Sequence, residues 1–272
     1  MSFFLEHKNC RLAYKITGSG PNALFIQGTG LHGNGWLPQI KELSKEFRCL
    51  TFDNRGVGAS RPNTTKITIA QMAEDALALM DDQGWKTAHI IGHSLGGAVA
   101  QQIALTAPAR VQSLALLCTF AKGSDATALT TKMFWIGMRT YIGTRRMRRH
   151  AFLEILLPRK LLATADRDQL AAEFAPLFGH DLADHPPAAM QQLAALRAYD
   201  STPHLKNLAT IPTLVVGAEE DVLARPAIVR SLAQNIPNAK LIELQECAHG
   251  VPIHSSEKIN QLLHEHFSRT ET

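Results

Sequence analysis

The sequence has no long apolar segment. Its 272 residues are 45% hydrophobic and 19% charged, a composition that is ordinary for a soluble globular protein and argues against disorder. No stretch approaches the roughly 20 apolar residues that a membrane-spanning helix needs. The first residues, MSFFLEHKNCRL, lack the apolar segment of a signal peptide. We therefore expect no stable membrane insertion and a cytoplasmic protein.

Cysteine is scarce, and metal-ligand motifs are absent from the sequence. The four cysteines, Cys10, Cys49, Cys118 and Cys247, are far apart and form no CxxC pair, so the spacing of a metal site is missing. Cys49 and Cys118 lie in apolar runs typical of buried strands, which predicts reduced core residues. We expect no metal and no other cofactor.

The net charge of +4 comes largely from one run, TRRMRRH, that contains Arg145, Arg146, Arg148 and Arg149. Charge runs usually form the solvated face of a helix, and we favour that interpretation. A site for an anionic substrate, phospholipid head groups or nucleic acid is the alternative. No nucleic-acid motif accompanies the run, so we expect no nucleic-acid partner.

Short apolar runs alternate with helical patterns along most of the chain. Most of the runs lack the polar alternation of half-exposed strands, which predicts a parallel sheet covered on both faces. Helical patterns between the runs complete a doubly wound, mostly parallel α/β fold. The predicted strands are Asn22–Gln27, Cys49–Phe52, Ala88–Gly92, Leu114–Cys118, Thr213–Gly217 and Lys240–Leu244, with Cys10–Thr17 as an antiparallel edge strand.

One interval, from Ala121 to Pro203, departs from this alternation. It contains no convincing strand, while Met, Leu, Phe and Ala recur in it at helical spacing. We predict that residues 121–203 form a helical cap. The cap would be inserted into a core domain made of residues 1–120 and 204–272.

A candidate nucleophile follows the predicted strand Ala88–Gly92. The segment Gly92-His93-Ser94-Leu95-Gly96 has the GxSxG pattern of a serine on a sharp strand-to-helix turn, where the two glycines avoid clashes. Such a turn projects the Ser94 hydroxyl from the sheet edge. At the helix start the Leu95 N–H can stabilise an oxyanion. The structural alternative is a glycine-rich turn with a capping serine.

With this motif in its strand-to-helix context, the sequence resembles the α/β-hydrolase superfamily, in particular its serine esterases and lactonases. The resemblance implies a nucleophile after the fifth strand and partners in the chain order serine, acid, histidine. A serine needs a histidine to accept its proton. The resemblance places that histidine at His249, in Cys247-Ala248-His249-Gly250 before the final helix. His254, His264 and His266, in or beside that helix, are expected at the surface.

The acid of such a triad orients the histidine and stabilises its protonated form. The resemblance places it a few residues beyond the strand Thr213–Gly217, where Asp221 matches best. Glu219 and Glu220 are close enough to compete, and Asp125, past the preceding strand, is a further alternative.

A second oxyanion donor is implied in the loop after the third strand. By resemblance it is the backbone N–H of Thr29. The family commonly has His-Gly where this chain has Gln27-Gly28. Because the donor belongs to the backbone, the glutamine need not abolish activity, but it leaves open how the loop is braced.

These residues predict an enzyme that hydrolyses a carboxylic ester, lactone or thioester of small-molecule size through an acyl-serine intermediate. Trp36, Phe120 and Trp135 are candidate substrate contacts, although aromatic residues are more often simple core. Carbon–carbon bond hydrolysis within the same fold is the alternative, and a non-catalytic small-molecule receptor is a third hypothesis, because fold alone does not fix function.

Overall fold

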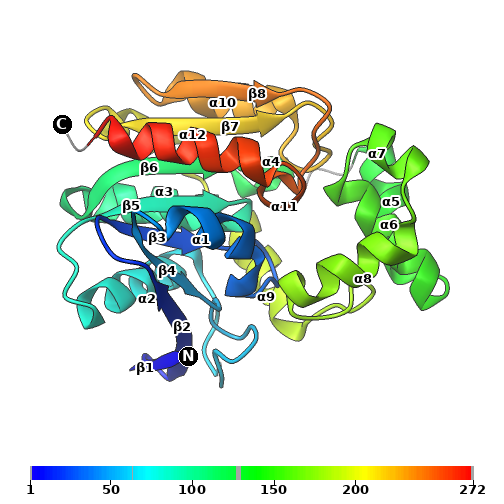
Figure 1. The fold of residues 1–272 in the computed structure, drawn as a ribbon, viewed down its shortest axis with the longest axis horizontal. Coiled ribbons are helices and arrows are strands. Elements are labelled where there is room, and N and C mark those ends of the chain that lie inside the picture. The colour runs from blue at the N-terminus through cyan, green and yellow to red at the C-terminus, as the bar shows by residue number, and fades with distance from the viewer. Residues whose placement is uncertain (1, 63, 127–129, 271–272) are drawn as a thin grey trace.

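The strands of the protein form one sheet at the centre of the computed structural model, which describes residues 2–62, 64–126 and 130–270 (Figure 1). The strand order is β1-β2-β4-β3-β5-β6-β7-β8. Strands β3 to β8 run parallel to one another, while β2 is antiparallel to both of its neighbours, β1 and β4. The strands are β1 Phe3–His7, β2 Cys10–Thr17, β3 Asn22–Ile26, β4 Arg48–Phe52, β5 Ala88–His93, β6 Val111–Leu117, β7 Thr213–Ala218 and β8 Lys240–Leu244.

The predicted mostly parallel sheet is confirmed, with one strand that the sequence patterns did not indicate. Strand β1 pairs with β2 across a turn in which Lys8 and Asn9 have φ of 46° and 61°. Its first residues, Phe3 and Phe4, are largely exposed, so β1 lacks the buried apolar run that marks the other strands. The strand Cys10–Thr17 is therefore second from the edge.

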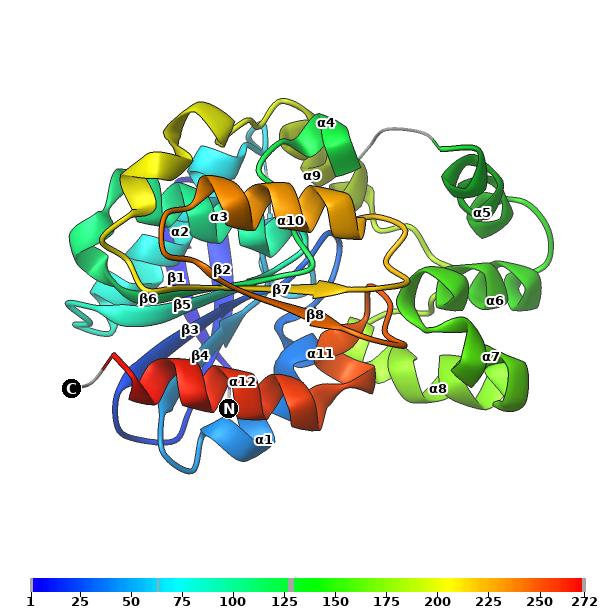
Figure 2. The ribbon, with the colours of Figure 1, turned by 90° about the horizontal axis from the view of Figure 1, so that it is seen from above.

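Helices cover both faces of the sheet (Figure 2): α2, α3 and α10 lie on one face, and α1 and α12 on the other. The α-helices are α1 Leu37–Leu43, α2 Ile69–Asp82, α3 Leu95–Thr106, α4 Gly123–Ala126, α5 Thr131–Tyr141, α6 Arg145–Leu156, α7 Arg159–Thr164, α8 Arg167–Phe178, α9 Pro187–Arg197, α10 Pro226–Asn235, α11 Val251–His254 and α12 Ser256–Ser268. Short 3-10 helices are η1 Gly33–Trp36, η2 Pro108–Arg110 and η3 Thr202–Leu208.

The main core lies between the sheet and these two helical layers. Every residue of β5 and β7 is buried, as expected for strands covered on both faces. Cys49 and Cys118 belong to this core and are free thiols, which confirms the interpretation of both as reduced core residues.

Helices α5 to α8 lie beyond the end of the sheet toward which β7 and β8 point (Figures 1 and 2). Helices α6 to α8 bury an apolar cluster of their own, which includes Leu153, Phe174 and Phe178. Helix α9 instead contributes Ala195 and Leu196 to the main core. Helices α6 to α8 therefore pack mainly around a cluster of their own, whereas α9 packs directly against the sheet layers.

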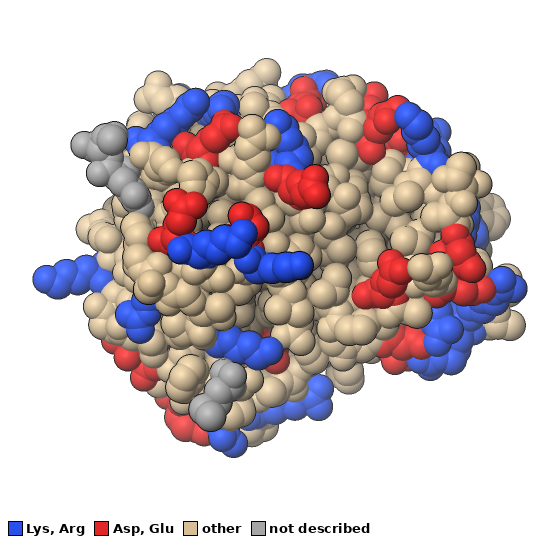
Figure 3. All heavy atoms as spheres, in the orientation of Figure 1, with Lys and Arg blue, Asp and Glu red and all other residues tan. Residues whose placement is uncertain are grey.

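The arginine run forms the start of α6, and three of its guanidinium groups pair with carboxylates of this same region. Arg145 contacts Asp181 and Asp184, and Arg149 also contacts Asp181. Arg146 pairs with an aspartate at the start of α8. Figure 3 shows blue and red atoms intermixed at this end of the molecule. These ion pairs support the interpretation of the run as a helix surface.

Among the described residues, no helix combines the length and the apolar character needed to cross a membrane.

Candidate active site

Ser94 lies on the sharp turn between β5 and α3. Its φ of 54° and ψ of −122° are unusual for a residue with a side chain. The backbone fits only because its neighbours lack side chains: a Cβ at Gly92 would lie 2.2 Å from the Gly96 oxygen, and one at Gly96 would lie 2.1 Å from the Ile26 oxygen. The carbonyl of Ser94 accepts a hydrogen bond from Thr119 Oγ1 at 2.6 Å. The turn is thus held rigidly by packing and hydrogen bonds.

His249 and Asp221 form a buried pair at the same edge of the sheet. Nδ1 of His249 lies 2.8 Å from Oδ2 of Asp221. The other carboxylate oxygen accepts the backbone N–H groups of Leu223 and Ala224 at 2.8 and 2.9 Å. Burial alone would raise the pKa of Asp221, but His249 and the donated hydrogen bonds outweigh it, so its pKa lies below the usual value. Asp221 is therefore an anion at neutral pH.

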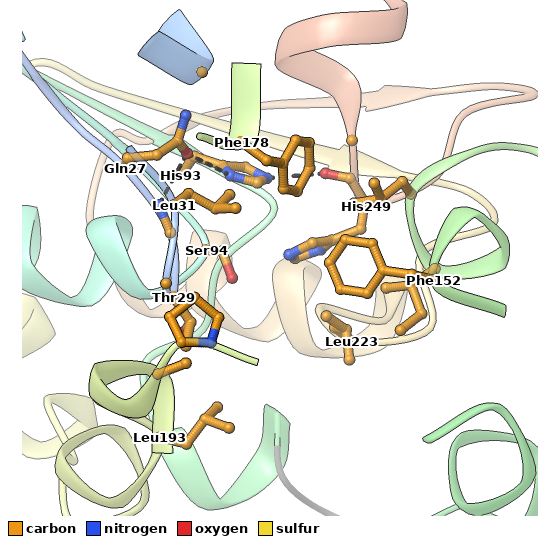
Figure 4. A pocket seen from close by; sticks show the side chains of 18 of the residues that line it. Gln27, Thr29, Leu31, His93, Ser94, Phe152, Phe178, Leu193, Leu223 and His249 are labelled. Atoms are coloured by element: carbon orange, nitrogen blue, oxygen red, sulfur yellow. Dashed lines mark hydrogen bonds between the residues drawn. The ribbon is translucent and has the colours of Figure 1, made fainter. Parts of the chain in front are cut away.

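This ionised carboxylate determines which ring nitrogen of His249 carries the proton. A carboxylate only accepts hydrogen bonds, so Nδ1 carries the hydrogen and Nε2 keeps its lone pair. In Figure 4 the Ser94 hydroxyl points toward the imidazole of His249 across the pocket that both residues line. The arrangement presents a hydroxyl and a proton acceptor to the same cavity.

His93, the residue before Ser94, supports the His249 loop. Its Nε2 donates to the His249 carbonyl oxygen at 2.9 Å. Burial, together with the neighbouring His249, lowers the pKa of His93 to about 3, so the ring is neutral. Trp36 packs edge-on against His93, with 6.4 Å between ring centroids, and is fully buried. The structure therefore places Trp36 behind the site and outside the cavity wall.

The loop after β3 leaves one amide N–H available near the nucleophile. Gly28 N–H donates to Gln27 Oε1 at 2.9 Å, and Gly30 N–H donates to Gln192 Oε1 at 2.8 Å. Leu31 N–H donates to the Gly28 carbonyl at 3.3 Å. Within the described part of the chain, the N–H of Thr29 between them has no acceptor. Gln27 thus braces the loop from within.

Leu95, as the first residue of α3, also has an N–H without an intrahelical acceptor. The positive end of the helix dipole lies at the same place. Thr29, which lines the same cavity as Ser94, and Leu95, which follows Ser94 in the chain, therefore each have a backbone N–H of the kind that can bind an oxyanion.

The other acids considered from the sequence bind other groups or are exposed. Glu219 accepts the backbone N–H of Glu246, and Glu220 accepts N–H groups of Arg159. Asp125 is exposed on α4. Asp221 is therefore the carboxylate that the fold brings to the histidine ring.

Ser94 and His249 open into a cavity of about 330 Å³ at the end of the sheet. Its wall is mainly apolar and includes Phe120 after β6, Phe152 on α6 and Phe178 on α8 (Figure 4). Trp135 on α5 is 56% exposed and does not reach this wall. Helical periodicity could indicate that this region supplies apolar faces, but it could not indicate which residues face the cavity.

Three potential metal ligands, Cys118, Asp221 and His249, have ligand atoms within 4.8 Å of one another in the described part of the chain. Two of them already bind each other. Burial raises the pKa of the Cys118 thiol well above its usual value, so the thiolate that a metal would require is disfavoured. The donor set fits a hydrogen-bonded acid–base pair better than a metal centre.

Comparison with known proteins identifies the class of protein that this fold and site define. Residues 23–255 match the family described as alpha/beta hydrolase fold, and the chain belongs to this family. The sequence-based prediction of the family is therefore confirmed.

Individual relatives of the chain have several names. A protein of Stutzerimonas stutzeri named "Putative carbamate hydrolase RutD" is 30% identical over 262 residues, which cover 93% of this chain and 94% of that protein. "Putative non-heme bromoperoxidase BpoC" of Mycobacterium tuberculosis is 29% identical over 247 residues, 88% of this chain and 90% of that protein. The crystal structure of a hydrolase from Pseudomonas aeruginosa has a TM-score of 0.82 and 26% identity, covering 97% of each chain.

Proposed function

We propose that the protein is a serine hydrolase that cleaves a carboxylic ester, lactone or thioester. The observation that carries this proposal is the buried His249–Asp221 hydrogen bond at 2.8 Å, beside a serine held at positive φ. A serine hydroxyl becomes an effective nucleophile when an oriented histidine accepts its proton. Ser94 and that histidine line one cavity, and the carboxylate that orients the ring lies 2.8 Å from its Nδ1.

In the proposed reaction, Ser94 Oγ attacks the carbonyl carbon while His249 Nε2 takes the hydroxyl proton. The N–H groups of Thr29 and Leu95 bind the resulting oxyanion. His249 then returns the proton to the leaving alkoxide or thiolate, and an acyl-serine remains. Water deprotonated by His249 attacks the acyl group, and the acid leaves with Ser94 regenerated. Asp221 stays ionised throughout and stabilises the imidazolium.

The cavity supports a substrate with an apolar acyl or alcohol group. Aromatic and aliphatic side chains from the β6–β7 segment form most of its wall, among them Phe152, Phe178 and Leu193. Burying each methylene of a substrate there contributes roughly 0.8 kcal/mol. We propose that residues 121–203, which include helices α4 to α9, act as the cap that selects this group.

The direct test is turnover of short p-nitrophenyl esters by the wild type and by Ser94→Ala. Ser231→Ala, which removes an exposed serine hydroxyl on α10, is the matched control. We expect Ser94→Ala to lose turnover and Ser231→Ala to retain it. Normal turnover by Ser94→Ala would refute the assignment of the nucleophile.

The substrate class is tested by a panel that also contains a lactone, a thioester and a carbamate, the last because a relative's name includes carbamate hydrolysis. Cleavage of esters, thioesters or lactones that depends on Ser94 supports the proposal. Labelling of Ser94 by a fluorophosphonate without turnover of any of these would instead favour carbon–carbon bond hydrolysis or a receptor.

A further inference from the structure

We propose that Gln192 is a positioning residue that holds the oxyanion loop, residues 28–31, and couples helix α9 to the reaction. This inference rests on the proposed function, because it assigns Gln192 a part in stabilising the oxyanion of that reaction. Gln192 lies outside the set of residues that line the cavity, so it acts through the loop and does not touch substrate.

The contact that carries the proposal is a buried hydrogen bond between distant parts of the chain. Gly30 N–H donates to Gln192 Oε1 at 2.8 Å, across 162 residues of sequence. Gln192 has no exposed surface. A hydrogen bond shielded from water in this way is a well-defined geometric constraint on the loop.

Helix α9 also packs directly against the same loop. A Cβ placed on Gly30 would lie 3.2 Å from the Cβ of Ala189 and 3.8 Å from Pro186. The backbone of the loop at Gly30 therefore lies so close to α9 that a side chain there would be in tight contact with the helix, and the hydrogen bond to Gln192 keeps the loop from moving away. Together these contacts fix the distance between helix and loop.

This constraint acts on the proposed oxyanion donor through the planar peptide units. The N–H of Gly30 belongs to the peptide that follows Thr29, and the N–H of Gly28 is held by Gln27. Thr29 therefore lies between two anchored amides, and its own N–H, which has no acceptor in the described part of the chain, is available as the proposed donor. The Thr29 N–H belongs to the preceding Gly28–Thr29 peptide, so losing the Gln192 anchor would free the peptide next to the donor and loosen the orientation of the donor.

The same helix contacts the proposed substrate pocket. Ala189, Met190, Leu193 and Leu196 of α9 line the cavity, while Gln192 reaches the loop. A substrate group that packs on this face of α9 contacts the helix whose Gln192 holds the oxyanion loop. We therefore infer that occupancy of the pocket by an apolar group raises the rate of the chemical step as well as binding.

The side-chain amide of Gln192 does not simply stabilise the folded state. Its Nε2 is buried and has no hydrogen-bond partner in the described part of the chain, and such an unpaired donor destabilises the folded state. Removing the amide thus removes one unfavourable group along with one hydrogen bond. This balance makes it feasible to measure an effect on rate in a variant that still folds.

The test compares Gln192→Met, which keeps the length of the side chain and removes the acceptor, with Gln192→Glu, which keeps an acceptor oxygen. Gln191→Met, an exposed neighbour on α9, is the matched control. For each variant we would measure kcat and KM with p-nitrophenyl butyrate, and the affinity for an alkyl boronic acid, which forms a tetrahedral adduct with the serine.

We expect Gln192→Met to lower kcat and boronate affinity about tenfold with KM within twofold, because loosening an oxyanion donor removes an interaction made in the transition state. Gln192→Glu should lie between Gln192→Met and the wild type, and Gln191→Met should match the wild type. In the wild type, kcat should rise from the acetate to the hexanoate ester, and Gln192→Met should flatten that rise.

Wild-type kcat and boronate affinity in Gln192→Met would overturn the proposal, as would a rise in KM with kcat unchanged. If Gln192→Met does not fold, Gln192→Leu, which also removes the acceptor, decides by the same two measurements. Ser94→Ala distinguishes failure of this proposal from failure of the proposed function. If Ser94→Ala loses turnover and Gln192→Met behaves like the wild type, only the role of Gln192 is rejected. If Ser94→Ala retains turnover, the proposed function itself is rejected.

Discussion

Replacing Asp221 by asparagine should disable His249 through a change of tautomer that the local geometry enforces. One carboxylate oxygen of Asp221 accepts two backbone N–H groups, from Leu223 and Ala224. An amide NH2 cannot face two donors, so the oxygen of the new side-chain amide must take this position and its NH2 must face Nδ1 of His249. That nitrogen then becomes an acceptor, and the proton moves to Nε2.

A histidine protonated at Nε2 cannot accept the Ser94 proton. Loss of the acceptor in this way lowers kcat on the order of 10⁴-fold in serine hydrolases with such a triad, which corresponds to roughly 5.4 kcal/mol of transition-state stabilisation. The folded state should change little, because the amide keeps the size of the carboxylate and its bonds to Leu223 and Ala224.

The assay is the rate of p-nitrophenyl butyrate hydrolysis between pH 6 and 9, with circular dichroism to verify folding. Glu220→Gln is the matched control, since Glu220 contacts Arg159 and lies next to Asp221 in sequence. We expect Glu220→Gln to stay within twofold of the wild type. A loss of less than tenfold in Asp221→Asn, or a larger loss in Glu220→Gln, Glu219→Gln or Asp125→Asn, would refute the reasoning.

Three further predictions concern stability, acid sensitivity and the pocket. Asp75→Asn should lower the free energy of unfolding by about 3–5 kcal/mol in urea melts, because it removes the carboxylate charge that pairs with the fully buried Arg55; a loss below about 1 kcal/mol would contradict this. Burial lowers the pKa of His89 to about 4 and of His93 to about 3. In this pH range the unfolded chain therefore binds protons at these histidines that the folded chain does not bind. The free energy of unfolding in urea melts should fall from pH 6.5 to pH 4, by up to about 1.4 kcal/mol per pH unit for each histidine. A free energy of unfolding that does not change with pH would contradict this prediction. Leu193→Trp, which fills part of the cavity, should reduce kcat/KM for hexanoate esters more than for acetate, by about fourfold for each methylene that no longer fits; equal losses for both esters would show that the cavity does not hold the acyl group.

The parts of the structure that could be predicted from sequence are those specified locally. A GxSxG segment between an apolar run and a helix signature requires few distant contacts, and the turn at Ser94 follows from its own glycines. Thr68 likewise caps α2 by accepting the Gln71 N–H at 3.0 Å, as its capping-box signature indicates. The loops after parallel strands meet at one sheet edge, so residues after β5, β7 and β8 could be expected to converge.

Contacts between distant segments could not be predicted in the same way. Nothing in the local sequence of Gln192 indicates that it reaches Gly30, because the pairing depends on how α9 packs on the loop. The sequence makes Trp36 and Trp135 candidate pocket residues, with Trp36 favoured by its place near the oxyanion loop, yet Trp36 packs in the core against His93 and Trp135 faces solvent. Strand β1 was missed because a half-exposed strand lacks a continuous apolar run.

The central claim, that Ser94 is the nucleophile of a Ser94–His249–Asp221 triad, is tested most directly by covalent labelling. The protein would be treated with a fluorophosphonate, digested, and the modified residue located by mass spectrometry. We predict one adduct per chain, on the peptide that contains Ser94, formed much more slowly in Asp221→Asn and absent in Ser94→Ala. An adduct on a different residue, or continued ester turnover by a protein fully labelled at Ser94, would contradict the claim.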